Sequence, residues 1–89
     1  MKAIVTVVGH DQKGIIAKTS GVLFENDVNI LDISQTIMQD MFTMIMLVEY
    51  DGKAVSASEL NKKLEELGEE IGLSVRFQRE ELFTSMHRI

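Results

Sequence analysis

The chain has 89 residues, 45% of them hydrophobic and 26% charged, which is typical of one soluble globular domain without a separate catalytic unit. Its formal net charge of −5 argues against a surface that follows the phosphates of a nucleic acid. The absence of cysteine excludes disulfides and thiolate metal sites, and no apolar run approaches the roughly 20 residues of a membrane span, so we expect a cytoplasmic protein with no membrane partner.

The first part of the sequence predicts a strand and a helix. Residues 2–8 are largely apolar on both faces, which is typical of a central strand. Residues 15–25 have helical spacing, and we expect Gly21 within them to permit close packing on a sheet. This helix is expected to end at Asn26 and Asp27, because both tolerate the left-handed conformation. Its predicted buried stripe consists of Ile16, Ser20, Leu23 and Phe24, with Ala17 beside it.

Two extended segments follow. Residues 28–38 alternate imperfectly and are the most polar of the predicted strands, so we expect an edge strand. Residues 39–41 are short enough for a hairpin connection. Residues 42–50 carry apolar side chains on both faces, and we expect this strand to be buried on both sides.

The last part predicts a helix, a strand and a terminal helix. Residues 56–59 have the form of a capping box, Leu60, Leu64, Leu67 and Ile71 recur at helical spacing, and Gly72 ends the pattern. Residues 73–78 alternate cleanly and predict a half-buried strand. Residues 80–89 predict a short helix with one apolar side, formed by Leu82, Phe83, Met86 and Ile89.

The order β-α-β-β-α-β predicts an α+β fold, the ferredoxin-like sandwich. Two split right-handed units give a four-stranded antiparallel sheet with both helices on one face. We expect a single domain over residues 1–89, with the core at 1–79 and a C-terminal helical tail at 80–89. Because the first and third strands are apolar on both faces, the second face should be covered by the tail helix, by a partner subunit, or by both. We therefore expect a homo-oligomer, most simply a two-fold dimer.

The loop between the first strand and the first helix is the best candidate for a ligand site. It has Gly9 and Gly14 at its ends, and a strand-to-helix turn of this kind aims backbone N–H groups and a helix dipole at one point. That geometry suits a small anion such as a carboxylate. His10 is more typical of a surface loop histidine than of a general base, so an enzyme using His10 and Asp11 is the least favoured hypothesis.

Other chemistry known on this topology does not match the residues. A heavy-metal carrier needs paired cysteines, and an RNA-recognition domain needs stacking aromatics on its central strands together with basic charge. An acylphosphatase-like enzyme needs an arginine in the first loop, where this chain has only Lys13. We therefore expect no catalytic residues, no metal, no cofactor and no nucleic-acid partner.

Residues 9–17 and 28–30 resemble the ACT domain, a regulatory ligand-binding module with the same order of elements. Asp11, Gly14, Asn29 and Ile30 match the positions of its motif. The resemblance covers residues 2–78, and segments 33–36 and 86–89 are similar to a family of small stand-alone ACT proteins of uncharacterised function. The chain departs from the pattern in two places: Lys13 stands where many members have proline, and Asn26-Asp27 where many have glycine.

The resemblance implies that the protein senses an amino acid or similar carboxylate metabolite at a homodimer interface, where second strands of two copies often pair. Asp11 would accept a hydrogen bond from an ammonium group, or would simply cap the helix. Backbone N–H groups at Gly14 and Ile15 would hold a carboxylate, and Asn29 of a second subunit would complete the site. The alternative for Asn29 is that it only forms hydrogen bonds at the end of the strand. The candidate ligand-binding residues are His10, Asp11, Gln12, Gly14, Ile15, Asn29 and Ile30. The alternative is a ligand-free module that regulates a protein partner in trans.

Overall fold

The computed structural model describes residues 1–10 and 12–79, and it confirms the ferredoxin-like fold. Four strands form one sheet in the order β2-β3-β1-β4, and each neighbouring pair is antiparallel. The tail helix predicted at 80–89 lies outside the described residues. The elements are β1 (Lys2–His10), α1 (Ile15–Glu25), β2 (Asn29–Met38), β3 (Met41–Glu49), α2 (Ala57–Ile71) and β4 (Ser74–Arg79).

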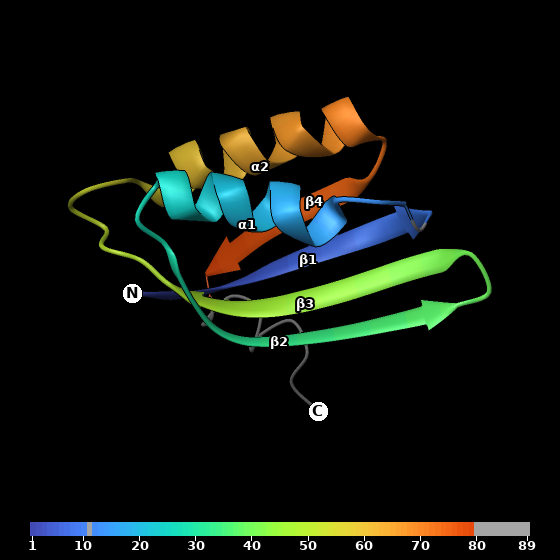
Figure 1. Ribbon diagram of the computed structural model, residues 1–89. Helices are drawn as coiled ribbons and strands as arrows, with labels where there is room; N and C mark the ends of the chain where they lie inside the picture. Colours follow the sequence, from blue (N-terminus) through green and yellow to red (C-terminus); the bar gives the residue numbers. More distant parts are fainter. Residues whose placement is uncertain (11, 80–89) are drawn as a thin grey trace.

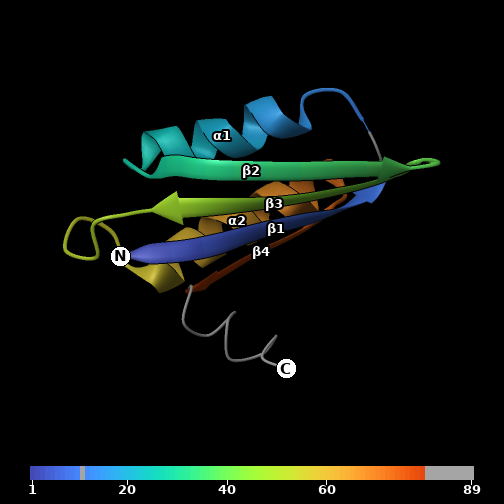
Figure 2. The ribbon, with the colours of Figure 1, turned by 90° about the horizontal axis from the view of Figure 1, so that it is seen from below.

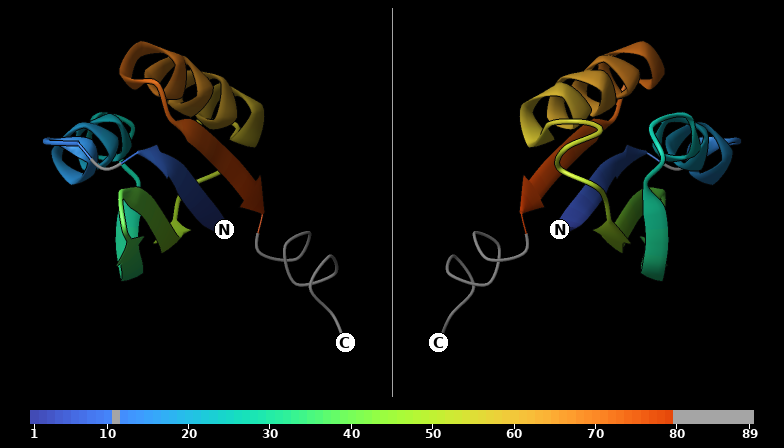
Figure 3. Two further views of the ribbon diagram at one scale, coloured as in Figure 1. Left: turned by 90° about the vertical axis from the view of Figure 1, so that its right-hand side faces the viewer. Right: turned by 90° about the vertical axis from the view of Figure 1, so that its left-hand side faces the viewer.

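The two helices of the described residues, α1 and α2, lie on the same face of the sheet (Figures 1 and 3). Side chains alternate across a strand, so every second residue of the central strands points at the helices. In β1 and β3 these residues are fully or almost fully buried, and they form the core together with the apolar side of α2. They are Ala3, Val5, Val7, Phe42, Met44, Met46 and Val48, packed with Leu60 and Leu64.

The helix α1 is rotated relative to the prediction. Its buried residues are Ile15, Thr19 and Leu23, so the predicted stripe was wrong except for Leu23. Ile16 is 42% exposed and Phe24 is 82% exposed. The helix carries large apolar side chains on two neighbouring sides, and hydrophobic spacing alone does not decide which side packs on the sheet.

The glycine expected to allow close packing was also assigned wrongly. A Cβ added at Gly21 would meet nothing within 4 Å. The close approaches occur instead at Gly68, where a Cβ would lie 2.6 Å from the backbone oxygen of Leu73, and at Gly9, where it would collide with the Leu73 side chain. The turn that contains Leu73 is therefore packed tightly between α2 and β1.

The helix ends follow the sequence signals. Ser56 accepts a hydrogen bond from the backbone N–H of Glu59 at 3.1 Å, as the capping box predicts, and Gly72 ends α2 in the left-handed conformation. The backbone N–H of Asn26 donates to the carbonyl groups at the end of α1, and Asp27 follows with φ 57°. Both predicted terminations are confirmed.

The strand β2 lies at one edge of the sheet, as predicted, and its residues from Leu31 onward are exposed. A register shift between Ile30 and Asp32 explains why its alternation looked imperfect in the sequence. The expectation that β3 is buried on both sides is not met within one chain. Its side that faces away from the helices includes Ile45, which is 40% exposed, because neither α1 nor α2 covers that face.

Candidate functional site

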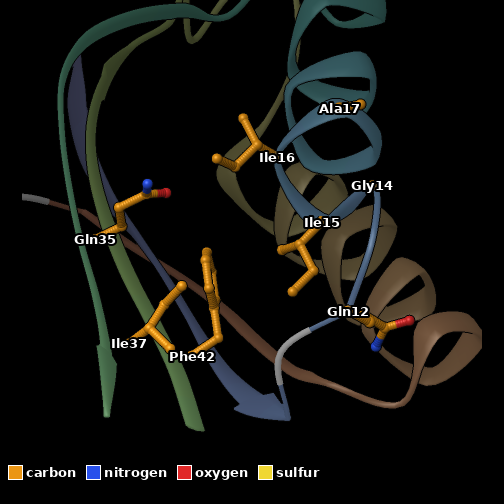
Figure 4. A pocket seen from close by; sticks show the side chains of 8 residues that line it. All are labelled: Gln12, Gly14, Ile15, Ile16, Ala17, Gln35, Ile37 and Phe42. Carbon is orange, nitrogen blue, oxygen red and sulfur yellow. The ribbon is translucent and has the colours of Figure 1, made fainter. Parts of the chain in front are cut away.

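An open hollow of about 530 Å³ lies between the start of α1 and the strands β2 and β3 (Figure 4). The loop and first turn of α1 form one wall, and the end of β2 with the start of β3 forms the other. The lining residues are Gln12, Gly14, Ile15, Ile16, Ala17, Gln35, Ile37 and Phe42. The predicted ligand-binding residues Gln12, Gly14 and Ile15 are therefore brought together here.

The first turn of α1 gives the hollow its capacity to hold an anion. Gly14 is the N-cap residue, with φ 84°, and no side chain of the described residues caps the backbone N–H groups of this end. The first helical hydrogen bond runs from the N–H of Lys18 to the carbonyl of Gly14 at 2.9 Å. The N–H groups before it have no side-chain cap among the described residues, and together with the positive end of the helix dipole a helix start of this kind can hold a carboxylate.

The two glutamines of the hollow have different roles. The side chain of Gln35 extends from β2 into the hollow toward Ile16 (Figure 4). The side-chain amide of Gln12 instead donates to the carbonyl of Ile71 at 2.6 Å, at the far end of α2. Gln12 therefore ties the loop to α2, whereas Gln35 presents an uncharged amide to a molecule in the hollow.

The remaining walls are apolar. Ile15 and Phe42 are each 3% exposed and belong to the core, while Ile16 and Ile37 stand at the rim and are partly exposed. None of the lining side chains is charged. The hollow can therefore accommodate a small molecule with one anionic group near α1 and an apolar body over Ile37 and Phe42.

Asn29 and Ile30 do not lie in this hollow. They line a second open hollow of about 590 Å³ at the other end of α1, together with Phe24 and its neighbours. Ala17 lines both hollows, so a continuous surface runs along α1 beside β2. Within one chain the structure thus separates the two halves of the predicted site.

His10 lies outside both hollows. Its Nδ1 is 3.3 Å from a carboxylate oxygen of Asp40 in the β2–β3 hairpin, and both side chains are more than 75% exposed. Asp11 lies outside the described residues. Among the residues that the structure describes, no group of three acidic or histidine side chains is arranged to hold a metal ion.

The sequence prediction missed four further residues of the first hollow: Ala17, Gln35, Ile37 and Phe42. It also placed Ile16 in the core. Gln35 faces the helices because it pairs with Met44, which lies on that side of the sheet. The irregularity near Leu31 shifts the alternation of β2, so the sequence pattern did not show this orientation. Gln35 stands in the most polar of the predicted strands, so its polar side chain gave no distinct signal in the sequence.

Neither helix in the described part of the chain has the length and apolar character needed to span a membrane.

Residues 2–78 match the model of the family described as the ACT domain. A UPF0237 protein of Clostridium acetobutylicum is 51% identical over 89 residues, which is the full length of both chains. Among solved structures, an ACT domain protein from Streptococcus pneumoniae has 40% identity and a TM-score of 0.83, with 93% of each chain covered. The regulatory subunit of aspartate kinase from Thermus thermophilus has 28% identity and a TM-score of 0.69, covering 89% of this chain and 51% of that one. The chain therefore belongs to the ACT domain family.

Proposed function

We propose that the protein is a regulatory module, without catalytic activity, that senses an amino acid or similar carboxylate metabolite at a homodimer interface. The observation that carries the proposal is the hollow at the start of α1, which combines backbone N–H groups that no described side chain caps with apolar, uncharged walls. An amino acid has the matching parts, because its carboxylate fits the helix end and its side chain fits the walls. Kinship with a regulatory subunit of aspartate kinase agrees with a regulatory role.

The edge strand β2 supports a dimer in which two copies of this strand pair antiparallel. The first hollow lies beside the end of β2, at Gln35 and Ile37, and the second beside its start, at Asn29 and Ile30. Antiparallel pairing sets the start of one β2 beside the end of the other. The second hollow of one copy then faces the first hollow of its partner, and the two form one composite site.

The composite site explains how separated residues act on one ligand. The first hollow supplies N–H groups for the carboxylate, and Asn29 of the second copy offers a side-chain oxygen to the ammonium group. We assign Asp11 the same acceptor role, as the family motif implies. Because no lining side chain of the first hollow is charged, apolar amino acids should bind better than acidic or basic ones.

The test is a thermal-shift screen with the common amino acids at millimolar concentration. A ligand that binds only the folded protein raises the melting temperature by mass action. The substitution Gln35→Glu places a carboxylate in the hollow with almost no change of shape. It should weaken binding of the best ligand at least about tenfold, which corresponds to roughly 1.4 kcal/mol.

The matched control is Gln39→Glu. It changes the net charge equally, but Gln39 lies in the hairpin after β2 and lines neither hollow. It should leave affinity within about twofold of the original, a free-energy change of less than about 0.5 kcal/mol. If no amino acid shifts the melting temperature, the ligand-binding proposal is wrong and the ligand-free interaction module becomes the better account.

A further inference from the structure

Two residues of α1 have surroundings that the described chain does not explain. Phe24 is 82% exposed, more than any other large apolar side chain of the described residues. Gly21 costs about 1 kcal/mol of helix stability relative to alanine, yet a Cβ added there would meet nothing within 4 Å. Both residues line the second hollow, so a surface that packs against this side of α1 would account for the exposed ring and for the missing side chain.

The first hollow is closed at its floor and open at its mouth. Ile15 and Phe42 form the floor and belong to the buried core, whereas Ile16 and Ile37 at the rim are 42% and 52% exposed. Figure 2 shows α1 alongside β2, and both views of Figure 3 place these two elements on the same side of the molecule. The mouth between them therefore opens on the side from which a second copy would pair with β2.

We propose that Phe24 of the partner subunit packs across this mouth, against Ile16 and Ala17, and completes the apolar wall that contacts the side chain of the ligand. This contact rests on the proposed function, because it requires two copies paired antiparallel through β2. Ala17 lines both hollows, so a ring that packs on Ala17 from outside reaches the first hollow as well as the second.

Two-fold symmetry brings Phe24 to this position. The first hollow lies at the end of β2 and the start of α1, and the second at their opposite ends, so the two elements run antiparallel and share a middle. A two-fold axis beside that middle sets the end of one α1 next to the start of the other, level with Ile16 and Ala17. Ser20 and Gly21 lie at the middle of α1, and their small size lets the two helix backbones approach closely.

A second copy fits this surface better than an unrelated partner does. The surface carries a projecting ring at one end and an open apolar mouth at the other, so it is complementary to itself under a two-fold rotation. Large exposed apolar side chains also gather on α1 and β2, which is typical of a surface that another protein covers. They are Ile16, Phe24, Leu31, Ile33, Ile37 and Met38.

The ring would act on the part of the ligand that points away from its carboxylate. With the carboxylate at the start of α1, a short side chain such as that of alanine ends inside the hollow, over Ile37 and Phe42. A longer apolar side chain extends to the mouth and contacts the ring of Phe24, which adds buried apolar area. Phe24 is therefore a specificity-determining residue that favours large apolar amino acids over alanine.

Disulfide trapping tests the contact without a ligand, because the sequence contains no cysteine. The variant Ala17→Cys with Phe24→Cys should form disulfide-linked dimers at least about tenfold faster than Lys18→Cys with Phe24→Cys, because only the first pair comes within the Cα separation of about 4–7 Å that a disulfide spans. Lys18 is exposed on α1 and lines neither hollow. Mild oxidation at micromolar protein, followed by non-reducing electrophoresis, gives both rates.

Ligand selectivity tests the role of the ring. Measured by isothermal titration calorimetry, Phe24→Ala should weaken the binding of leucine at least about fivefold, because apolar contact area is lost. It should leave the affinity for alanine within about twofold. Ile45→Ala is the matched control, since Ile45 is 40% exposed on the open face of the sheet, which neither α1 nor α2 covers, and it should change neither affinity.

The two measurements distinguish this contact from ligand sensing itself. Rapid 17/24 linkage in a protein that binds no amino acid would support the contact and reject the sensing role. A dimer that pairs through β2 but links the 17/24 pair no faster than the 18/24 pair would overturn the contact. A Phe24→Ala variant that keeps the full preference for leucine over alanine would overturn the specificity role.

Discussion

Thr19 is a polar residue at a core position where an apolar side chain would give a more stable fold. Its side chain is fully buried on the inner side of α1, and its hydroxyl has no hydrogen-bond partner among the described residues. A buried hydroxyl that has lost its water without gaining a partner reduces stability. The neighbouring buried residues of the helix, Ile15 and Leu23, are both aliphatic.

Thr19→Val should therefore stabilise the protein, by about 1 kcal/mol, because valine has nearly the same shape without the unpaired hydroxyl. Urea denaturation followed by circular dichroism measures the change. Thr19→Ser is the control, since it keeps the hydroxyl but removes a buried methyl group, and it should destabilise by about 1 kcal/mol. A loss of stability in the valine variant would mean that the hydroxyl has a partner after all.

At the scale of the elements, α2 and the turn before β4 meet at Gly68, which has the closest backbone neighbour of the described glycines. A Cβ at Gly68 would lie 2.6 Å from the carbonyl oxygen of Leu73 and 3.1 Å from a methyl group of Val75. The N–H of Leu73 donates to the carbonyl of Gly68 at 2.8 Å, so the turn is held in place and has little room to retreat.

Gly68→Ala should accordingly destabilise the protein by roughly 1–3 kcal/mol, the usual cost of forcing extra atoms into a packed site. Intrinsic helix propensity alone predicts the opposite sign, a gain of about 1 kcal/mol. Glu66→Ala, an exposed position two residues earlier, controls for propensity and should change stability by less than about 0.5 kcal/mol. An unfolding free energy that rises in Gly68→Ala would contradict the packing described here.

The elements differ in how far the sequence alone could define them. The helix α2 was predictable because its cap at Ser56, its leucine spacing and its final glycine all agree. The orientation of α1 was not predictable, since the side with Ile15 and Leu23 and the side with Ile16 and Phe24 could each pack on the sheet. Only the packed structure shows which pair is buried.

The candidate site was predictable only in part for a related reason. Gly14 and Ile15 belong to a local motif that can be recognised in the sequence. Gln35, Ile37 and Phe42 reach the hollow through the pairing of β2 with β3, which depends on a strand register that the irregularity near Leu31 shifts. A site built from distant segments requires the register, and hydrophobic alternation does not supply it.

At the scale of the whole molecule, the exposed edge of β2 is the surface that the proposed dimer would bury. Ile33 lies at the middle of this strand and is 43% exposed. Ile33→Asp should convert the dimer to a monomer, because two carboxylates would be brought near the two-fold axis and removed from water. Sedimentation velocity at micromolar concentration measures the change in mass.

Ile45→Asp is the matched control for the dimer prediction. Ile45 has nearly the same exposure, 40%, but lies on the open face of β3 away from the edge. This variant should remain dimeric. A monomeric wild-type protein, or dissociation by Ile45→Asp and not by Ile33→Asp, would rule out pairing through β2.

In the composite site, one ligand contacts the start of α1 in one subunit and residues 29–30, beside the other end of α1, in the second subunit. Titration of the isotopically labelled protein with the best-binding amino acid, followed by amide NMR, tests it in one measurement. We predict that amides of residues 14–17 and of residues 29–30 shift together over the same range of ligand concentration, and that Ile33→Asp abolishes both responses. Shifts confined to one of the two groups, or responses that persist unchanged in a monomeric Ile33→Asp variant, would contradict a composite ligand site between two subunits.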